Sequence, residues 1–169
     1  GKDLEKIPNL WVYNTLISWA KDSADLELLE QMSLSDFLKG REHLLDKSGS
    51  PSPRLVIFDQ FEELFTFYQE RWEQREDFFD QVGEALNEDI LLRVLVVMRE
   101  EYLANLDPYV HPLPGRFRTR YRLDRLGRDA ALSAIEGPLE NTTCKFDEGV
   151  ALTLVEKLLT TQVKGANGK

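Results

Sequence analysis

Two short apolar runs constrain the fold of this chain more than any other feature. Residues 55–58 read Leu-Val-Ile-Phe, residues 94–98 read Val-Leu-Val-Val-Met, and neither run alternates with polar residues. Continuous apolar runs rich in β-branched residues are typical of strands that are buried on both faces of a parallel sheet. We therefore expect two buried, parallel strands at 54–58 and 94–98.

The stretch between these two runs is amphipathic. Its apolar side chains recur at helical spacing and predict one long helix with a core-facing stripe. A strand, a helix and a second strand form a βαβ unit, whose right-handed crossover brings the carboxyl ends of both strands to one edge of the sheet. Open α/β sheets bind ligands at that edge. The stripe consists of Phe61, Leu64, Phe65, Tyr68, Trp72, Phe79, Val82 and Leu86, with Phe78 beside it.

The rest of the chain is expected to be mainly helical. A segment rich in serine and proline, residues 48–53, separates the first helices from the first strand. Ser33 or Ser35 is a candidate N-cap for the second helix, and Asp147 is one for the last helix. The spacing predicts helices over 10–20, 34–45, 100–106, 128–136 and about 150–159, and an edge strand over 118–123.

Charge and cysteine content exclude several classes of function. The 169 residues carry 30 Asp and Glu against 21 Lys and Arg, and this net charge of -9 argues against attraction of the whole chain to nucleic acid or an anionic membrane. One cysteine, Cys144, and two histidines form neither a disulfide framework nor a Cys/His zinc site. The most apolar stretch is about half the roughly 20 residues that a spanning helix needs. We therefore expect a cytoplasmic protein without a membrane span.

Charged side chains stand at the ends of both predicted strands. Asp59 follows the first run, and it reads either as a magnesium ligand of a Walker B element or as the N-cap of the next helix. Arg99 follows the second run, and it reads either as a contact to a γ-phosphate or as an ion-pair partner of Asp59 or Glu63. Glu62 and Glu63 either orient a water molecule or stabilise the helix N-terminus through its macrodipole.

Three segments in this order resemble a known family. Residues 54–66, which contain Asp-Gln-Phe-Glu-Glu, are similar to the Walker B segment of bacterial STAND NTPases, signal-transduction ATPases usually fused to repeat domains. Residues 97–106 are similar to the sensor strand and following helix of that family. Residues 121–138 are similar to the entry into its helical subdomain.

The resemblance implies a fold class and a division into domains. It implies an α/β parallel-sheet core of the P-loop NTPase (AAA+/STAND-like) type, incomplete in residues 1–126, followed by the start of a helical subdomain in residues 127–169. The first strand, 54–59, would then be the Walker B strand, and 94–99 would be the sensor strand.

The resemblance also implies site residues, cofactors and partners. Asp59 would hold Mg²⁺, Glu62 or Glu63 would activate water, and Arg99 would sense the γ-phosphate of ATP, while Pro138 would lie near the base. The implied function is an ATP-dependent molecular switch in signalling or defence, which exchanges ATP and ADP. Self-oligomerisation and fused effector or repeat domains are implied partners.

Two features depart from the family pattern. The phosphate cradle, Gly-x-x-x-x-Gly-Lys followed by Ser or Thr, occurs nowhere in the sequence. The chain is therefore expected to begin downstream of that loop and to bind nucleotide poorly by itself, since the loop supplies most of the phosphate contacts. Gln60 also stands where many related ATPases place Glu, which weakens the expectation of efficient hydrolysis.

The alternative function is a non-enzymatic protein-interaction module on the same fold. It would use the acidic helix, residues 59–89, and the arginine-rich segment, residues 116–128, as contact surfaces. If the latter forms a strand, its alternating arginines share one face. That face could pair with the acidic helix, hold a neighbouring subunit's nucleotide or contact nucleic acid; pairing with the acidic helix is favoured, and nucleic acid is disfavoured.

Overall fold

The computed structural model describes residues 7–20 and 26–166 of the chain. The chain divides into two compact units, Gly1–Arg120 and Tyr121–Lys169, and each is described by itself. None of the described helices is long and apolar enough to cross a membrane.

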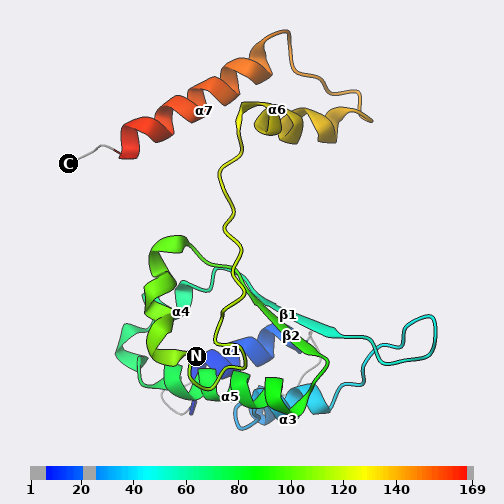
Figure 1. The fold of residues 1–169 in the computed structure, drawn as a ribbon, viewed down its shortest axis with the longest axis vertical. Helices are drawn as coiled ribbons and strands as arrows, with labels where there is room; N and C mark the ends of the chain where they lie inside the picture. The colour runs from blue at the N-terminus through cyan, green and yellow to red at the C-terminus, as the bar shows by residue number, and fades with distance from the viewer. Residues whose placement is uncertain (1–6, 21–25, 167–169) are drawn as a thin grey trace. The chain divides into compact units, whose positions relative to one another are not determined.

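The first unit is built on a parallel pair of strands, as the two apolar runs predict. Strand β1 (Arg54–Phe58) pairs with β2 (Leu92–Val96), and helix α5 (Gln74–Glu88) is the longest element between them in the sequence (Figure 1). The fold is therefore mixed α/β with a small two-stranded parallel sheet. β2 begins and ends two residues before the predicted strand, because Phe58, the last residue of β1, is in register with Val96.

The two faces of the strand pair differ, and the prediction of strands buried on both faces is wrong. Val56 and Leu92 are buried against Leu38 and Ala85 in a small apolar cluster. The alternate side chains of β1 point the other way, and Leu55 and Ile57 are 58% and 54% exposed. A pleated strand places successive side chains on opposite faces, so the described residues bury one face of the sheet and leave the other open.

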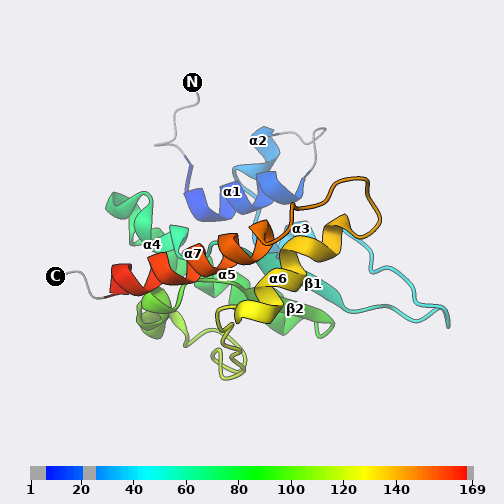
Figure 2. The same ribbon diagram turned by 90° about the horizontal axis from the view of Figure 1, so that it is seen from above.

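Three helices lie on the buried face. Helix α1 (Leu10–Trp19) and helix α3 (Leu34–Lys39) both pack on α5, and all three lie on the same side of the strands (Figures 1 and 2). The short helix α2 (Leu26–Leu29) lies between α1 and α3 in the sequence.

Side-chain caps fix where α1 and α3 begin. The side chain of Asn9 accepts hydrogen bonds from the backbone of Trp11 and Val12, and its amide donates to Asp77 of α5 at 2.6 Å. Ser33 is the N-cap of α3, which decides between the two predicted candidates. The predicted helix over 34–45 is too long, because α3 ends at Lys39 with Gly40 as its C-cap.

The prediction of one long helix between the strands is wrong. Three elements replace it: α4 (Glu63–Thr66), the 3-10 turn η2 (Gln69–Arg71), and α5. Tyr68 has a φ of 45°, a left-handed conformation that interrupts a helix. The interruption also exposes the middle of the predicted apolar stripe, since Tyr68 is 42% and Trp72 57% exposed.

Aromatic side chains fill the core under the strands. Phe78 and Phe79 of α5 are 2% and 1% exposed, as core packing predicts. The ring of Phe79 stacks on Tyr109 at a centroid distance of 5.0 Å. Tyr109 ends the 3-10 segment η3 (Glu100–Tyr109), which follows β2 and covers the predicted helix at 100–106.

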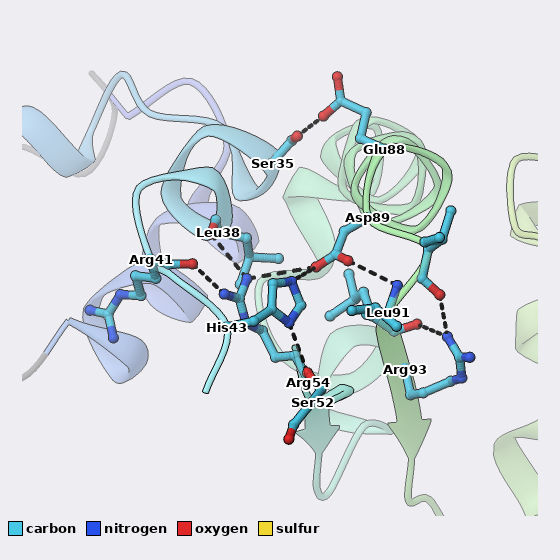
Figure 3. A network of polar contacts seen from close by, with 12 residues as sticks. Ser35, Leu38, Arg41, His43, Ser52, Arg54, Glu88, Asp89, Leu91 and Arg93 are labelled. Atoms are coloured by element: carbon cyan, nitrogen blue, oxygen red, sulfur yellow. Dashed lines mark hydrogen bonds and ion pairs between the residues drawn. The ribbon is translucent and has the colours of Figure 1, made fainter. Parts of the chain in front are cut away.

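A polar network joins the amino ends of the two strands (Figure 3). Asp89 Oδ2 lies 3.0 Å from His43 Nε2 and 3.8 Å from Arg54 Nη1. Asp89 Oδ1 accepts the backbone N–H of Leu91 at 2.9 Å, and His43 Nδ1 lies 2.9 Å from the carbonyl oxygen of Ser52. One carboxylate therefore holds the segment before β1 against the turn that begins β2.

The predicted edge strand over 118–123 does not form. Residues 118–127 have no regular structure, and β1 and β2 pair with each other within the described sheet. Gly115, Arg116 and Phe117 have φ values of 74°, 49° and 50°, so the chain turns just before the segment. A strand needs a hydrogen-bonding partner, and alternation of side chains alone does not supply one.

The second unit consists of two helices and a short turn. Helix α6 (Arg128–Glu136) has the predicted bounds, and the 3-10 turn η4 (Gly137–Leu139) continues from it. Helix α7 (Val150–Ala166) includes the predicted last helix and extends it. Arg128 of α6 and Glu156 of α7 form an ion pair at 3.3 Å.

Candidate functional site

The carboxyl ends of β1 and β2 remain joined beyond the last paired residues. The backbone N–H of Val97 donates to the carbonyl of Phe58 at 2.8 Å, and the N–H of Phe61 donates to the carbonyl of Val97 at 3.0 Å. Next, the N–H of Arg99 donates to the Glu62 carboxylate, Oε2, at 3.3 Å. The last residue of β1 and the chain that follows it are therefore connected to the chain after β2 at three successive points.

A left-handed residue makes this connection possible. Gln60 has a φ of 52°, which turns the chain so that the next residue, Phe61, points its N–H back to the second strand. Non-glycine residues rarely adopt this conformation, and such positions are concentrated at functional sites. Asp59 supports the turn, because its Oδ1 accepts the N–H of Gln60 at 2.9 Å.

Asp59 and Glu63 line an open hollow beside the strand ends. Its volume is about 430 Å³, and its other wall is the polar side of α1. This wall was not predicted from the sequence, although the spacing of the polar residues within an otherwise apolar helix is a usable signal. The α1 residues that line the hollow are Trp11, Asn14, Thr15, Ser18 and Trp19.

The two candidate glutamates have different surroundings. The Glu62 carboxylate accepts the hydrogen bond from Arg99 and is half-buried. Glu63 is exposed, lines the hollow with Asp59, and makes no side-chain hydrogen bond or ion pair with any described residue. Glu63 lies in the first turn of α4, where the macrodipole interpretation places it, whereas Glu62, at the N-cap position, makes no side-chain cap hydrogen bond.

Arg99 lies beyond the strand end and pairs with a neighbour. β2 ends at Val96, so Arg99 does not directly end the strand as predicted. Its guanidinium forms an ion pair with Glu101 and lies 6.0 Å from the ring of Tyr102. The predicted ion pair with Asp59 or Glu63 is absent from the described residues. The Arg99 side chain is 65% exposed and stands in contact with solvent.

The pKa of Glu101 lies below its ordinary value. The main cause is a hydrogen bond from its own backbone amide, and the positive charge of Arg99 acts in the same direction. Both effects favour the ionised carboxylate. Glu101 is therefore a charged partner for Arg99, and this pairing was not among the predictions from the sequence.

A magnesium ion here would have fewer than three protein ligands of the usual kinds among the described residues. The described residues contain no group of three or more His, Cys, Asp or Glu side chains that could hold a metal. Mg²⁺ in nucleotide sites is usually held by one or two carboxylates together with phosphate oxygens and water. Asp59 fits this requirement, since it is exposed and its Oδ2 makes no hydrogen bond with any described residue.

The remaining predicted residues lie outside this cluster. Pro138 is exposed in η4 of the second unit. In the arginine-rich segment, the Nε of Arg120 donates to the carbonyl of Phe117 at 2.9 Å, and Arg122 lies 3.9 Å from Asp124. These contacts are local, so they identify neither a phosphate nor a protein partner.

Comparison with known proteins gives one match. Residues 12–168 match the family described as Novel STAND NTPase 1. No curated protein and no solved structure matches the chain. The matched residues include both strands, the cluster at their carboxyl ends and the two helices of the second unit. The chain therefore belongs to the Novel STAND NTPase 1 family of NTPases.

Proposed function

We propose that this chain supplies the Walker B and sensor half of an ATP-dependent molecular switch. Its family implies an NTP-binding switch. Asp59 would hold the Mg²⁺ that accompanies ATP, and Arg99 would contact the γ-phosphate. A water molecule attacking that phosphate would be oriented by a nearby glutamate.

One observation carries the proposal. The residues on either side of Asp59 and the chain leading to Arg99 are connected by three hydrogen bonds at the carboxyl edge of a parallel strand pair. Open α/β sheets place their ligands at this edge. A carboxylate and a guanidinium that leave one edge can serve the metal and the phosphate of the same nucleotide.

The side chains at the edge would act on the nucleotide through charge. Bound Mg²⁺ would neutralise phosphate charge, and Asp59 would fix its position through one oxygen. To reach a γ-phosphate, Arg99 would exchange its ion pair with Glu101 for one with the phosphate. That exchange would make the Arg99 side chain responsive to whether ATP or ADP is bound.

We place the phosphate-binding loop of the switch outside these residues, because the Gly-x-x-x-x-Gly-Lys motif does not occur in the sequence. Most phosphate contacts in such sites come from the backbone amides of that loop and its lysine. The chain alone would then bind ATP and ADP weakly. In the complete switch, residues 127–169 would begin a helical subdomain whose reorientation follows nucleotide exchange, with Pro138 near the base.

Calorimetric titration tests the proposal. Mg-ATP and Mg-ADP are titrated into this chain and into a version extended upstream to include the phosphate-binding loop. Binding by the extended form, at least about tenfold tighter with Mg²⁺ than with EDTA, is the expected result. Absence of binding in both forms would overturn the proposal.

A second candidate function is a protein-interaction module without nucleotide chemistry. The observation that favours it is the open face of the strand pair, where Leu55, Ile57 and Leu95 are 58%, 54% and 47% exposed. Exposed apolar surface of this kind marks contact sites for other protein surfaces. Self-association of the chain, abolished by Ile57→Glu and unaffected by nucleotide, would support this alternative.

A further inference from the structure

We infer that Glu62 is a positioning residue that fixes the backbone of Arg99 against the loop that carries Asp59. This inference rests on the proposed function, whose site it deepens: Glu62 would connect the metal-binding side of the site to the phosphate-sensing side. Glu63 would then be the glutamate that is available to orient water.

The hydrogen bonds at the strand ends support this role. The first two connections, from Val97 to Phe58 and from Phe61 to Val97, join main-chain atoms. The third joins the Arg99 N–H to the Glu62 side chain at 3.3 Å. It is therefore the connection that a substitution can remove while the backbone turn at Gln60 stays in place.

The bond leaves the Arg99 side chain available. It engages the backbone N–H of Arg99, whereas the guanidinium is directed to Glu101 and Tyr102. A fixed backbone limits the positions that the end of a long side chain can reach, which lowers the entropic cost of placing it on a phosphate. Loss of the bond should therefore weaken sensing without removing the sensor.

Glu63 offers a matched contrast. It is the next residue in the chain, it carries the same charge, and it lines the hollow with Asp59. Its carboxylate has no partner among the described residues, whereas that of Glu62 is engaged. Loss of the Glu62 carboxylate therefore removes a hydrogen bond to the backbone of Arg99, whereas loss of the Glu63 carboxylate removes none with a described residue.

Amide hydrogen exchange of Arg99, measured by NMR on this chain, tests the bond directly. Glu62→Ala should accelerate the exchange about threefold to tenfold, because the acceptor is lost. Glu62→Gln should stay near the wild-type rate, because its amide oxygen still accepts a hydrogen bond. Glu63→Ala is the control and should leave the rate unchanged. Unchanged exchange in Glu62→Ala, or equal acceleration in Glu63→Ala, would overturn the inference.

Nucleotide binding by the form extended upstream to include the phosphate-binding loop tests the consequence. Glu62→Ala should reduce the preference for ATP over ADP about threefold to tenfold, and Glu62→Gln should restore it. If Glu62 were instead the general base, Gln would be as harmful to hydrolysis as Ala, and the positioning role would be wrong. If the wild type binds neither nucleotide, the proposed function fails, whereas the exchange rates still decide whether Glu62 holds Arg99.

Discussion

The carboxylates at the amino ends and at the carboxyl ends of the two strands differ in how many contacts they make within the protein. At the amino ends, Asp89 contacts His43 and Arg54 and accepts the N–H of Leu91 (Figure 3). At the carboxyl ends, Asp59 uses one oxygen for an adjacent amide. Both oxygens of Asp89 thus make contacts within the protein, whereas one oxygen of Asp59 is available to a ligand.

The carboxylates of Asp89 and Asp59 also differ in their exposure to solvent. The Asp89 side chain is 22% exposed and is enclosed by two basic side chains. Asp59 is exposed, and Arg99 pairs with Glu101 and not with it. A charged group that is partly buried must be compensated by the protein, whereas an exposed one is compensated by water or by a ligand. Substitutions at the two ends should therefore affect different measurements.

The largest effect is expected for Asp59→Ala. In a form of the protein that binds nucleotide, it should weaken Mg-ATP binding at least about 100-fold, or about 2.7 kcal/mol, because the metal loses its protein carboxylate. The free energy of unfolding should change by about 1 kcal/mol or less, as for loss of a turn-capping side chain. Calorimetry with and without Mg²⁺ measures the first effect. Asp80→Ala, an exposed carboxylate on α5, should bind normally. Equal losses in both variants would contradict the assignment.

The next effect is expected at the other end of the strands. Asp89→Ala should lower the free energy of unfolding by about 2 kcal/mol, because it leaves the N–H of Leu91 without its acceptor and removes the carboxylate that His43 and Arg54 contact. Urea unfolding followed by tryptophan fluorescence measures it, since all three tryptophans lie in the first unit. Asp89→Asn keeps an acceptor for Leu91 and should lose less. If Asp89→Ala were as stable as the wild type, the two ends would not differ as argued.

A smaller effect is expected for Arg99→Ala. The preference for ATP over ADP should fall about tenfold, or about 1.4 kcal/mol, because the guanidinium would contact the phosphate that ADP lacks. ADP affinity should hardly change. The control is Arg93→Ala, which removes an exposed arginine from the amino-terminal half of β2. A preference for ATP that survives in Arg99→Ala would contradict the sensor role.

The sequence was sufficient for elements whose signal is local. The apolar runs predict β1 and β2 as a parallel pair, and the spacing of apolar residues predicts α1, α6 and α7. The predicted helix between the strands fails at Tyr68, because side-chain periodicity continues across a residue whose backbone is left-handed. The predicted edge strand at 118–123 fails because alternation does not reveal whether a partner strand is nearby.

The candidate site shows the same division. The positions of Asp59 and Arg99 after apolar runs were visible in the sequence, and so was the pair Glu62 and Glu63. The difference between the two glutamates was not visible, because it depends on a backbone N–H from a residue 37 positions later. The pairing of Arg99 with Glu101 is close in sequence, but residue types alone do not choose it over Asp59 or Glu63.

The smallest expected effect is a change in the pKa of Asp46, which lies in the turn before β1. Asp46 accepts hydrogen bonds from Ser48 and Ser50, and these hold the pKa of its carboxyl below the ordinary value, with the Ser48 hydroxyl as the largest cause. Since the folded-state pKa is depressed, the turn is stabilised above the pKa of the unfolded chain and loses this stabilisation as the pH falls through the folded-state value. Ser48→Ala should raise the pKa of Asp46 towards the ordinary value, as followed by carboxyl NMR shifts. Ser52→Ala, outside this hydrogen-bond set, should not. If Asp46 titrated identically in Ser48→Ala and in the wild type, the Ser48 hydroxyl would not stabilise the Asp46 carboxylate. The turn would then differ from the Asp89 network, in which the carboxylate is stabilised by its contacts.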